Sequence, residues 1–205
     1  MDGATTDRAK PKPTAERILD AAVDAFGSRG YEATSLDALA AELGITKQAV
    51  LYWFPSKEAL LDAAIERGAG ELAVALDRAL AQAEPGFARF DAVMGAVFRF
   101  VVRRPSLLGL LREVNRLGPE LAADLAQQVQ PLVDRAVVFV EREMDAGTIR
   151  RCDPRLLLVF VYATVVGVAT EAEAQRAVGL PASTATLARL RRELFAFVRA
   201  AAIAR

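Results

Sequence analysis

The stretch TSLDALAAELGITKQAVLYWFP, residues 34–55, decides the fold of this chain. Ser35 can cap a helix at its N-terminus, and Gly44 can end it in the left-handed backbone conformation. Thr46 can cap a second helix only two residues later, which Pro55 must stop. Between the first cap and the glycine, apolar residues recur at helical spacing: Leu36, Leu39, Ala40 and Leu43. The stretch therefore predicts two helices joined by a tight turn, the second over residues 47–53.

Two helices joined by a tight glycine turn form a helix-turn-helix, whose second helix can enter the major groove of DNA. The second helix begins with Lys47, which can reach guanine or a phosphate, and Gln48, which can pair with adenine. Small hydroxyls at the helix starts suit phosphate oxygens, and the aromatic and basic residues after them lie where a phosphate backbone could pass. The candidate DNA-contacting residues are Thr34, Ser35, Thr46, Lys47, Gln48, Tyr52, Trp53 and Lys57.

Spacing alone leaves a plain helical hairpin as an equal alternative, because helix pairs with glycine turns are common. Charge does not favour DNA either: residues 1–60 carry seven basic and nine acidic side chains. Only charges near phosphates contribute strongly at physiological salt, so their placement matters more than their sum.

Residues from Thr14 to about Ala64 resemble the N-terminal domain of the TetR family of bacterial regulators. Four elements carry the resemblance in order, over about a quarter of the chain. They are RILDAA (17–22), AFGSRGY (25–31), TSLDALA (34–40) and GITKQAVLYWFPSKEALL (44–61).

The resemblance implies that Thr46, Lys47, Gln48, Tyr52 and Lys57 lie at a DNA surface. It also implies a homodimer on a near-palindromic operator, acting as a repressor that a small-molecule effector releases. The single cysteine, which excludes an internal disulfide, predicts a reducing cytoplasm. This chain has Leu51 where family members often carry a phosphate-contacting tyrosine, so Tyr52 can take that role from the next position. One short recognition helix reads few base pairs, which also favours a dimer.

We expect an all-α fold of nine helices in two domains. Residues 1–13 form an arm whose prolines block helix and whose Arg8, Lys10 and Lys12 either reach phosphates or stay solvated. Residues 14–60 form the DNA-binding domain, and 61–205 the effector-binding and dimerisation domain. The fourth helix, from Ser56 onward, belongs partly to both. Pro131 predicts a kink or a break in the seventh helix.

In the second domain the stretch GTIRRCDP, 147–154, resembles a recurrent family feature. By analogy the fifth to seventh helices enclose an effector cavity, and the eighth and ninth pair with a partner subunit. The eighth helix is apolar nearly all round, which predicts burial on several sides. We expect an apolar or aromatic effector. Candidate ligand-binding residues, each also readable as ordinary core, are Phe90, Met94, Phe98, Leu111, Arg112, Asn115, Phe160 and Thr164.

The amino-acid composition excludes several kinds of catalytic and metal site. The chain has no histidine and a single cysteine, Cys152, so it cannot build a Ser-His or Cys-His nucleophile pair, an internal disulfide or a Cys/His zinc site. We expect no metal and no cofactor. The longest apolar run, Leu156 to Ala169, is about 14 residues, whereas a membrane span needs about 20, so no membrane partner is expected.

Two other classes remain open. A carboxylate-based enzyme could use Glu141, Glu143, Glu171 and Glu173, but a spacing of two residues puts each pair on different helix faces. A helical adaptor would show no salt-dependent affinity for DNA.

Overall fold

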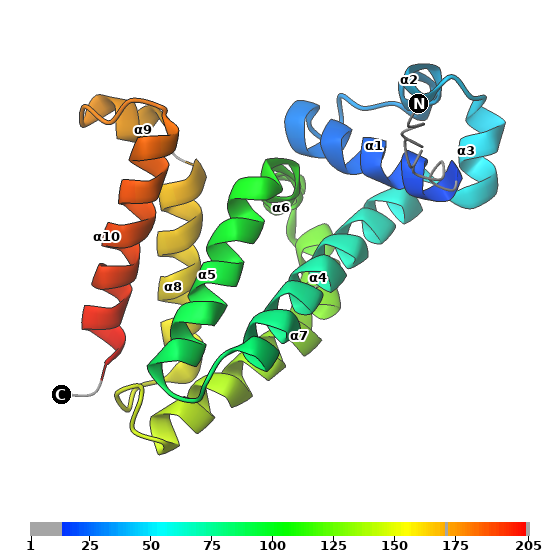
Figure 1. The fold of residues 1–205 in the computed structure, drawn as a ribbon. Coiled ribbons are helices and arrows are strands. Elements are labelled where there is room, and N and C mark those ends of the chain that lie inside the picture. Colours follow the sequence, from blue (N-terminus) through cyan, green and yellow to red (C-terminus); the bar gives the residue numbers. More distant parts are fainter. Residues whose placement is uncertain (1–13, 171, 204–205) are drawn as a thin grey trace, which may run out of the picture.

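The computed structural model describes residues 14–170 and 172–203, apart from some side chains between 115 and 125 and between 169 and 174. Within that part the chain is helical, with one isolated bridge between Ile149 and Ile203. Figure 1 shows the first three helices gathered at one end and a long fourth helix leading into a bundle. The described helices are α1 (Thr14–Arg29), α2 (Leu36–Leu43), α3 (Lys47–Trp53), α4 (Lys57–Gln82), α5 (Phe87–Arg103), α6 (Pro105–Leu117), α7 (Pro119–Asp145), α8 (Pro154–Thr170), α9 (Ala172–Ala177) and α10 (Thr184–Ala202).

The helix starts predicted from hydroxyl caps are confirmed. Ser35 Oγ accepts a hydrogen bond from the Ala38 N–H at 3.1 Å, and Ser56 Oγ accepts one from the Ala59 N–H at 3.0 Å. Each bond satisfies a backbone donor that has no partner in the first helical turn. Gly44 ends α2 with φ +67°, a conformation that a side chain would strain. The sharp corner between α2 and α3 therefore follows directly from the sequence.

Two details differ from the nine-helix expectation. A short helix, α9, precedes the final one; its AEAQRA sequence has no apolar stripe that periodicity could detect. Of the kink or break expected at Pro131, the break is wrong, because α7 continues from Pro119 to Asp145 with the proline inside it. Pro131 lies on an exposed face, and contacts of α7 with α4, α6 and α8 hold the helix on both sides of it.

One hydrophobic cluster joins the first four helices to α6. Ile18, Phe26, Leu39 and Val50 are fully buried in it, together with residues of the first half of α4. Leu107, Leu110 and Val114 of α6 complete the cluster. The first three helices thus share their core with a helix from the C-terminal part of the chain, besides the α4 connection that the sequence predicts.

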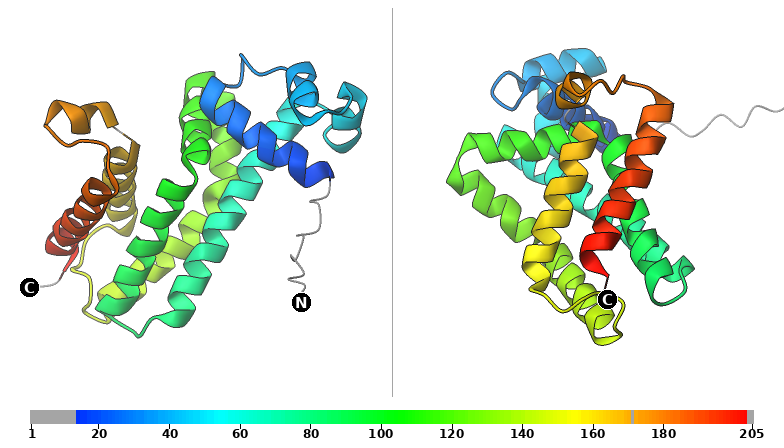
Figure 2. Two further views of the ribbon diagram at one scale, coloured as in Figure 1. Left: turned by 45° about the horizontal axis from the view of Figure 1, so that its top comes forward. Right: turned by 90° about the vertical axis from the view of Figure 1, so that its left-hand side faces the viewer.

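A second cluster joins α5, α7, α8 and α10, with Met94, Val140, Val165 and Val198 at its centre. Figure 2 shows α8 and α10 side by side at the edge of the bundle. The expectation that α8 is buried on several sides is wrong for the single chain. Exposed apolar side chains remain on α8 and α10: Leu156, Val159, Phe160, Tyr162 and Phe197.

Among the described residues no helix has the combined length and apolarity that crossing a membrane requires. The same part of the chain contains no group of three or more histidine, cysteine, aspartate or glutamate residues placed to hold a metal ion.

Candidate DNA-binding interface

Helix α3 lies on the surface with a buried anchor beneath it. Val50 is fully buried in the first cluster, while Lys47 and Gln48 are exposed at the start of the helix. The position of Val50 fixes the orientation of α3, because consecutive helical residues point about 100° apart. The two side chains with the best base-reading chemistry therefore point away from the core.

The hydroxyls of Ser35 and Thr46 are exposed and already accept one hydrogen bond each. Thr46 Oγ1 accepts from the Ala49 N–H at 3.2 Å, as Ser35 accepts from Ala38. A hydroxyl that accepts in this way keeps its own O–H to donate. Both residues can cap a helix and donate to a phosphate oxygen at once.

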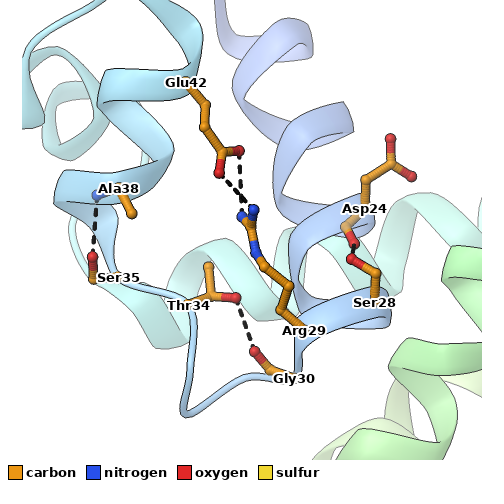
Figure 3. Close-up of polar contacts among 8 residues, drawn as sticks. All are labelled: Asp24, Ser28, Arg29, Gly30, Thr34, Ser35, Ala38 and Glu42. Atoms are coloured by element: carbon orange, nitrogen blue, oxygen red, sulfur yellow. Dashed lines mark hydrogen bonds and ion pairs between the residues drawn. The ribbon is translucent and has the colours of Figure 1, made fainter.

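Thr34 does not behave as the sequence suggested. Its side chain is 2% exposed, and its hydroxyl donates to the Gly30 carbonyl at 2.8 Å. Figure 3 shows this bond closing the loop between α1 and α2. The expectation that the Thr34 hydroxyl reaches a phosphate is therefore wrong. The residue instead fixes the loop that leads into α2.

The end of α3 presents two aromatic side chains. Tyr52 is 80% exposed and Trp53 48%, and their rings meet edge to face with centroids 5.2 Å apart. Leu51, which stands where the family often has tyrosine, is half-buried. Exposed aromatic side chains of this size stand out on a protein surface. Tyr52 is accordingly the tyrosine available for contact.

Both lysines of the interface have partners within the chain. Lys47 Nζ lies 2.8 Å from a carboxylate oxygen of Asp37, and both side chains are well exposed. Lys57 Nζ stacks over the Tyr31 ring, 4.1 Å from its centroid. The ion pair of Lys47 is weak in water, so a phosphate can compete for the lysine. Asp37 therefore places a negative charge directly beside the base-reading position.

Helices α1 and α2 are tied together behind this surface. Arg29 and Glu42 form a bidentate pair with a shortest distance of 2.5 Å, drawn in Figure 3. Arg17 donates to the Leu43 carbonyl at 3.1 Å, near the end of α2. An arginine there meets carbonyls that have no helical partner. These contacts hold α2 while α3 stays exposed.

A polar contact missed by sequence reasoning joins this unit to α6. The Glu113 carboxylate accepts the Tyr31 backbone N–H at 2.7 Å and pairs with Arg116 at 2.8 Å. The hydrogen bonds from Arg116 and Tyr31 hold the pKa of Glu113 below its usual range. Burial and a 3.0 Å hydrogen bond to Glu58 raise the pKa of the Tyr31 hydroxyl. Tyr31 and Glu113 are 82 residues apart in the chain, so local sequence spacing could not predict their contact.

A separate apolar cavity of about 120 Å³ lies among α4, α5, α7 and α8. Two of the predicted ligand residues, Phe90 and Met94, line it. Arg135 is its single charged lining residue and is paired with Asp77. Sequence reasoning missed the remaining wall, because its members look like ordinary core: Leu76, Leu80, Val93, Leu132, Ala136, Phe139, Val140, Leu157, Leu158 and Val161.

The other predicted ligand residues lie elsewhere. Phe98 is packed in the second cluster, and Leu111 is half-buried between the two clusters. Arg112 lines a different pocket, among α1, α5, α6 and α10. Phe160 is 63% exposed, and the Thr164 hydroxyl donates to its carbonyl, so neither lines the cavity. The Asn115 side chain falls outside the described part, as do Arg8, Lys10 and Lys12 of the arm.

The segment that builds the exposed α3 matches a known family. A model described as "Bacterial regulatory proteins, tetR family" matches residues 18–64, from α1 into α4. Residues 18–64 therefore form a TetR-family DNA-binding domain, and the chain is a DNA-binding transcriptional regulator. It binds DNA through the helix-turn-helix described above.

Two curated relatives extend the likeness of this regulator beyond that segment. The transcriptional regulator RutR of Escherichia coli K12 is 27% identical over 155 residues, 72% of this chain and 69% of RutR. The transcriptional repressor KstR of Mycobacterium tuberculosis is 29% identical over 119 residues, 58% of this chain and 54% of KstR.

Solved structures share the fold of this chain over 89% or more of its length. A protein of unknown function from Rhodococcus sp. RHA1 aligns at TM-score 0.73 and 26% identity, covering 96% of this chain and 98% of its own. FadR of Bacillus subtilis, in complex with stearoyl-CoA, aligns at 0.75 and 16% identity over 89% and 96%. AibR, in complex with isovaleryl-CoA and operator DNA, aligns at 0.72 and 21% over the same shares. The last two similarities show the fold alone.

Proposed function

We propose that this regulator is a repressor that binds a near-palindromic operator as a homodimer and leaves it when an apolar effector occupies the cavity. The observation that carries the proposal is the exposure of Lys47 and Gln48 on a short helix anchored by buried Val50. We infer that Ser35, Thr46, Tyr52, Trp53 and Lys57 position the helix on phosphates while Gln48 reads a base. The roles of RutR as a transcriptional regulator and of KstR as a transcriptional repressor support this proposal.

For the dimer, we infer an interface on α8 and α10, the eighth and ninth helices of the sequence prediction. The support is the set of exposed apolar side chains on these two adjoining helices, among them Phe160 and Phe197, each 63% exposed. A contiguous apolar surface of this kind is costly in water and marks an interaction site. A twofold interface would bring the same patch of both subunits together.

For the effector, the cavity supports a small apolar group. Its volume of about 120 Å³ is close to that of an engineered cavity of about 150 Å³ that binds benzene. Apart from Arg135, the cavity is lined by apolar side chains. The coenzyme A complexes of FadR and AibR support effector binding on this fold.

The link between cavity and DNA is inferred to be α4. Leu76 and Leu80 of α4 line the cavity, and Leu60 and Leu61 of the same helix lie in the first cluster. An effector that binds one placement of α4 better than another shifts the population toward it. Moving α4 would change the separation of the two recognition helices in a dimer. We further propose that residues 14–60 act as the DNA-binding domain and 61–205 as the effector domain.

The test is a binding titration on the intergenic DNA upstream of the protein's own gene, at several salt concentrations. We expect saturable binding of two subunits to one site, with affinity falling as salt rises. A scrambled duplex of equal length is the control. Equal weak binding to both duplexes would remove the claim of a sequence-specific regulator and favour the adaptor or enzyme alternatives.

A further inference from the structure

A second pocket of different chemistry lies between α4 and α5. It is a groove of about 300 Å³ and shares no lining residue with the apolar cavity, nor is it lined by α8 or α10. Its lining combines small apolar residues and one ring (Ala75, Ala79, Ala96 and Phe100) with polar residues (Arg78, Gln82, Arg99, Arg103 and Arg104). We call this set the arginine groove.

The arginine groove concentrates positive charge in a chain whose formal net charge is zero. Arg104 pairs with Glu71 at 2.6 Å. Arg78, Arg99 and Arg103 have no carboxylate within ion-pair distance in the part of the chain that the structure describes. Four arginines line this one groove, so an anion bound there would be attracted by several positive charges at once. The planar guanidinium fork matches phosphate oxygens two at a time.

The apolar part of the groove further limits the chemical class of anion that fits it. Ala79 and Ala96 are buried and close the floor of the groove, and half-buried Ala75 offers the accessible apolar surface on which a flat ring can lie. Phe100, half-buried at the same groove, supplies an aromatic contact for such a ring. Inorganic phosphate would use the arginines and leave this surface uncovered. A ligand with both a planar ring and phosphates would use the whole groove.

We propose that the arginine groove binds a nucleotide, with its base against Ala75 and Phe100 and its phosphates among Arg78, Arg99, Arg103 and Arg104. This site is separate from the effector cavity and does not depend on the proposed effector. It would give the regulator a second input, of a chemistry that the apolar cavity cannot accept.

A chain of ion pairs also connects the arginine groove to the DNA-binding helices. Arg104 binds Glu71, Glu71 pairs with Arg67 at 3.1 Å, and Arg67 pairs with Asp20 of α1 at 2.8 Å. A phosphate that draws Arg104 toward the groove weakens its hold on Glu71. The ion pairs that reach α1 then rearrange. Nucleotide binding should therefore change operator affinity as well as the stability of the chain.

The direct test is calorimetric titration of the full chain with ATP, ADP, pyrophosphate, inorganic phosphate and adenosine. We expect ATP and ADP to bind saturably, pyrophosphate more weakly, and adenosine without saturation. The ATP affinity should fall with added salt. No saturable ATP binding by the unaltered chain would overturn the proposal, as would equal affinities for ATP and pyrophosphate.

Variants locate the site. Arg99→Gln with Arg103→Gln should lower ATP affinity by about tenfold or more, since two charge-assisted contacts are lost. Arg142→Gln with Arg151→Gln removes the same charge from exposed positions outside the groove and should leave the affinity unchanged. Ala75→Met should reduce ATP affinity to that of pyrophosphate, because it covers the accessible apolar surface and spares the arginines.

Each arginine variant is first checked for an unchanged melting temperature, which is expected because the replaced arginines are exposed. Equal losses in the groove and control pairs would overturn the site assignment. So would a result in which short duplex DNA, and not ATP, protects the groove arginines from chemical modification. These titrations need no operator, so they can fail while the proposed repressor function stands.

Discussion

The backbones of Gly27 in α1 and Gly109 in α6 are in direct contact where the two helices cross. A Cβ atom on Gly109 would lie 2.0 Å from the Gly27 carbonyl oxygen, and a Cβ on Gly27 would lie 2.0 Å from the Ser106 carbonyl oxygen. No side chain can be accommodated there without separating the helices. Together with the Glu113–Tyr31 contact, this crossing makes α6 a second rigid connection between the DNA-binding helices and the rest of the chain, beside α4.

Gly109→Ala tests the crossing. The methyl group meets backbone atoms that cannot rotate away, so we expect a loss of about 1–3 kcal/mol in the free energy of unfolding, measured by urea denaturation. Gly70→Ala is the matched control, because a Cβ there meets nothing within 4 Å. That variant should be stabilised by up to about 1 kcal/mol, as alanine favours helix. Similar effects at both positions would show that the crossing is not tight.

Gln48→Ala tests base reading. If Gln48 pairs with a base, the variant should lose about 1–3 kcal/mol on the operator and little on a scrambled duplex. Lys57→Ala should instead weaken binding to both sequences by a similar factor and flatten the salt dependence. Fluorescence anisotropy with the two duplexes measures both. Unchanged discrimination between the duplexes in Gln48→Ala would contradict the assigned role.

Asp37→Asn tests the ion pair at the interface. The substitution frees Lys47 from the carboxylate 2.8 Å away and removes a negative charge near the DNA. Affinity should rise severalfold for operator and scrambled duplex alike, most clearly at low salt. Asp145→Asn removes an equivalent exposed carboxylate, paired with Arg151, far from α3 along the chain and should leave DNA affinity unchanged. A fall in affinity for Asp37→Asn would mean that the carboxylate positions Lys47 productively.

Glu113→Gln tests the polar contact to α6. The pKa of Glu113 is lower in the folded chain than its ordinary value of 4.5, so its ionised form stabilises the fold above that pH. That contribution is lost as the pH falls through the lower, folded pKa. The variant should therefore melt below the unaltered chain at pH 7, with a difference that shrinks in strongly acidic buffer. Thermal unfolding followed by circular dichroism at several pH values measures it, and a pH-independent difference would contradict the linkage.

Ala136→Phe tests the cavity. Ala136 is half-buried on its wall, and a phenyl ring there would occupy much of the 120 Å³. Benzene should raise the melting temperature of the unaltered chain and leave that of the variant unchanged, because binding only to the folded state stabilises it. Operator binding by the variant should persist. A benzene response that survives the substitution would place the ligand elsewhere.

Sequence alone predicted the features that depend on near neighbours. The caps at Ser35, Thr46 and Ser56, the glycine corner at Gly44 and the exposed start of α3 each rest on interactions within a few residues. The helical class and most helix ends follow for the same reason. The short α9 was not predicted because its six residues, three alanines and three polar residues, form no periodic apolar stripe.

Tertiary structure alone decided what depends on distant partners. Thr34 became a buried loop residue because Gly30 offers its carbonyl, and Phe160 lies outside the cavity because α8 turns that face to solvent in the single chain. The contact of Gly27 with Gly109 and the gathering of arginines between α4 and α5 join positions with no fixed spacing in sequence. Local sequence sets which face of a helix is apolar. The crossing of two helices, set by how their surfaces pack, decides which residues meet.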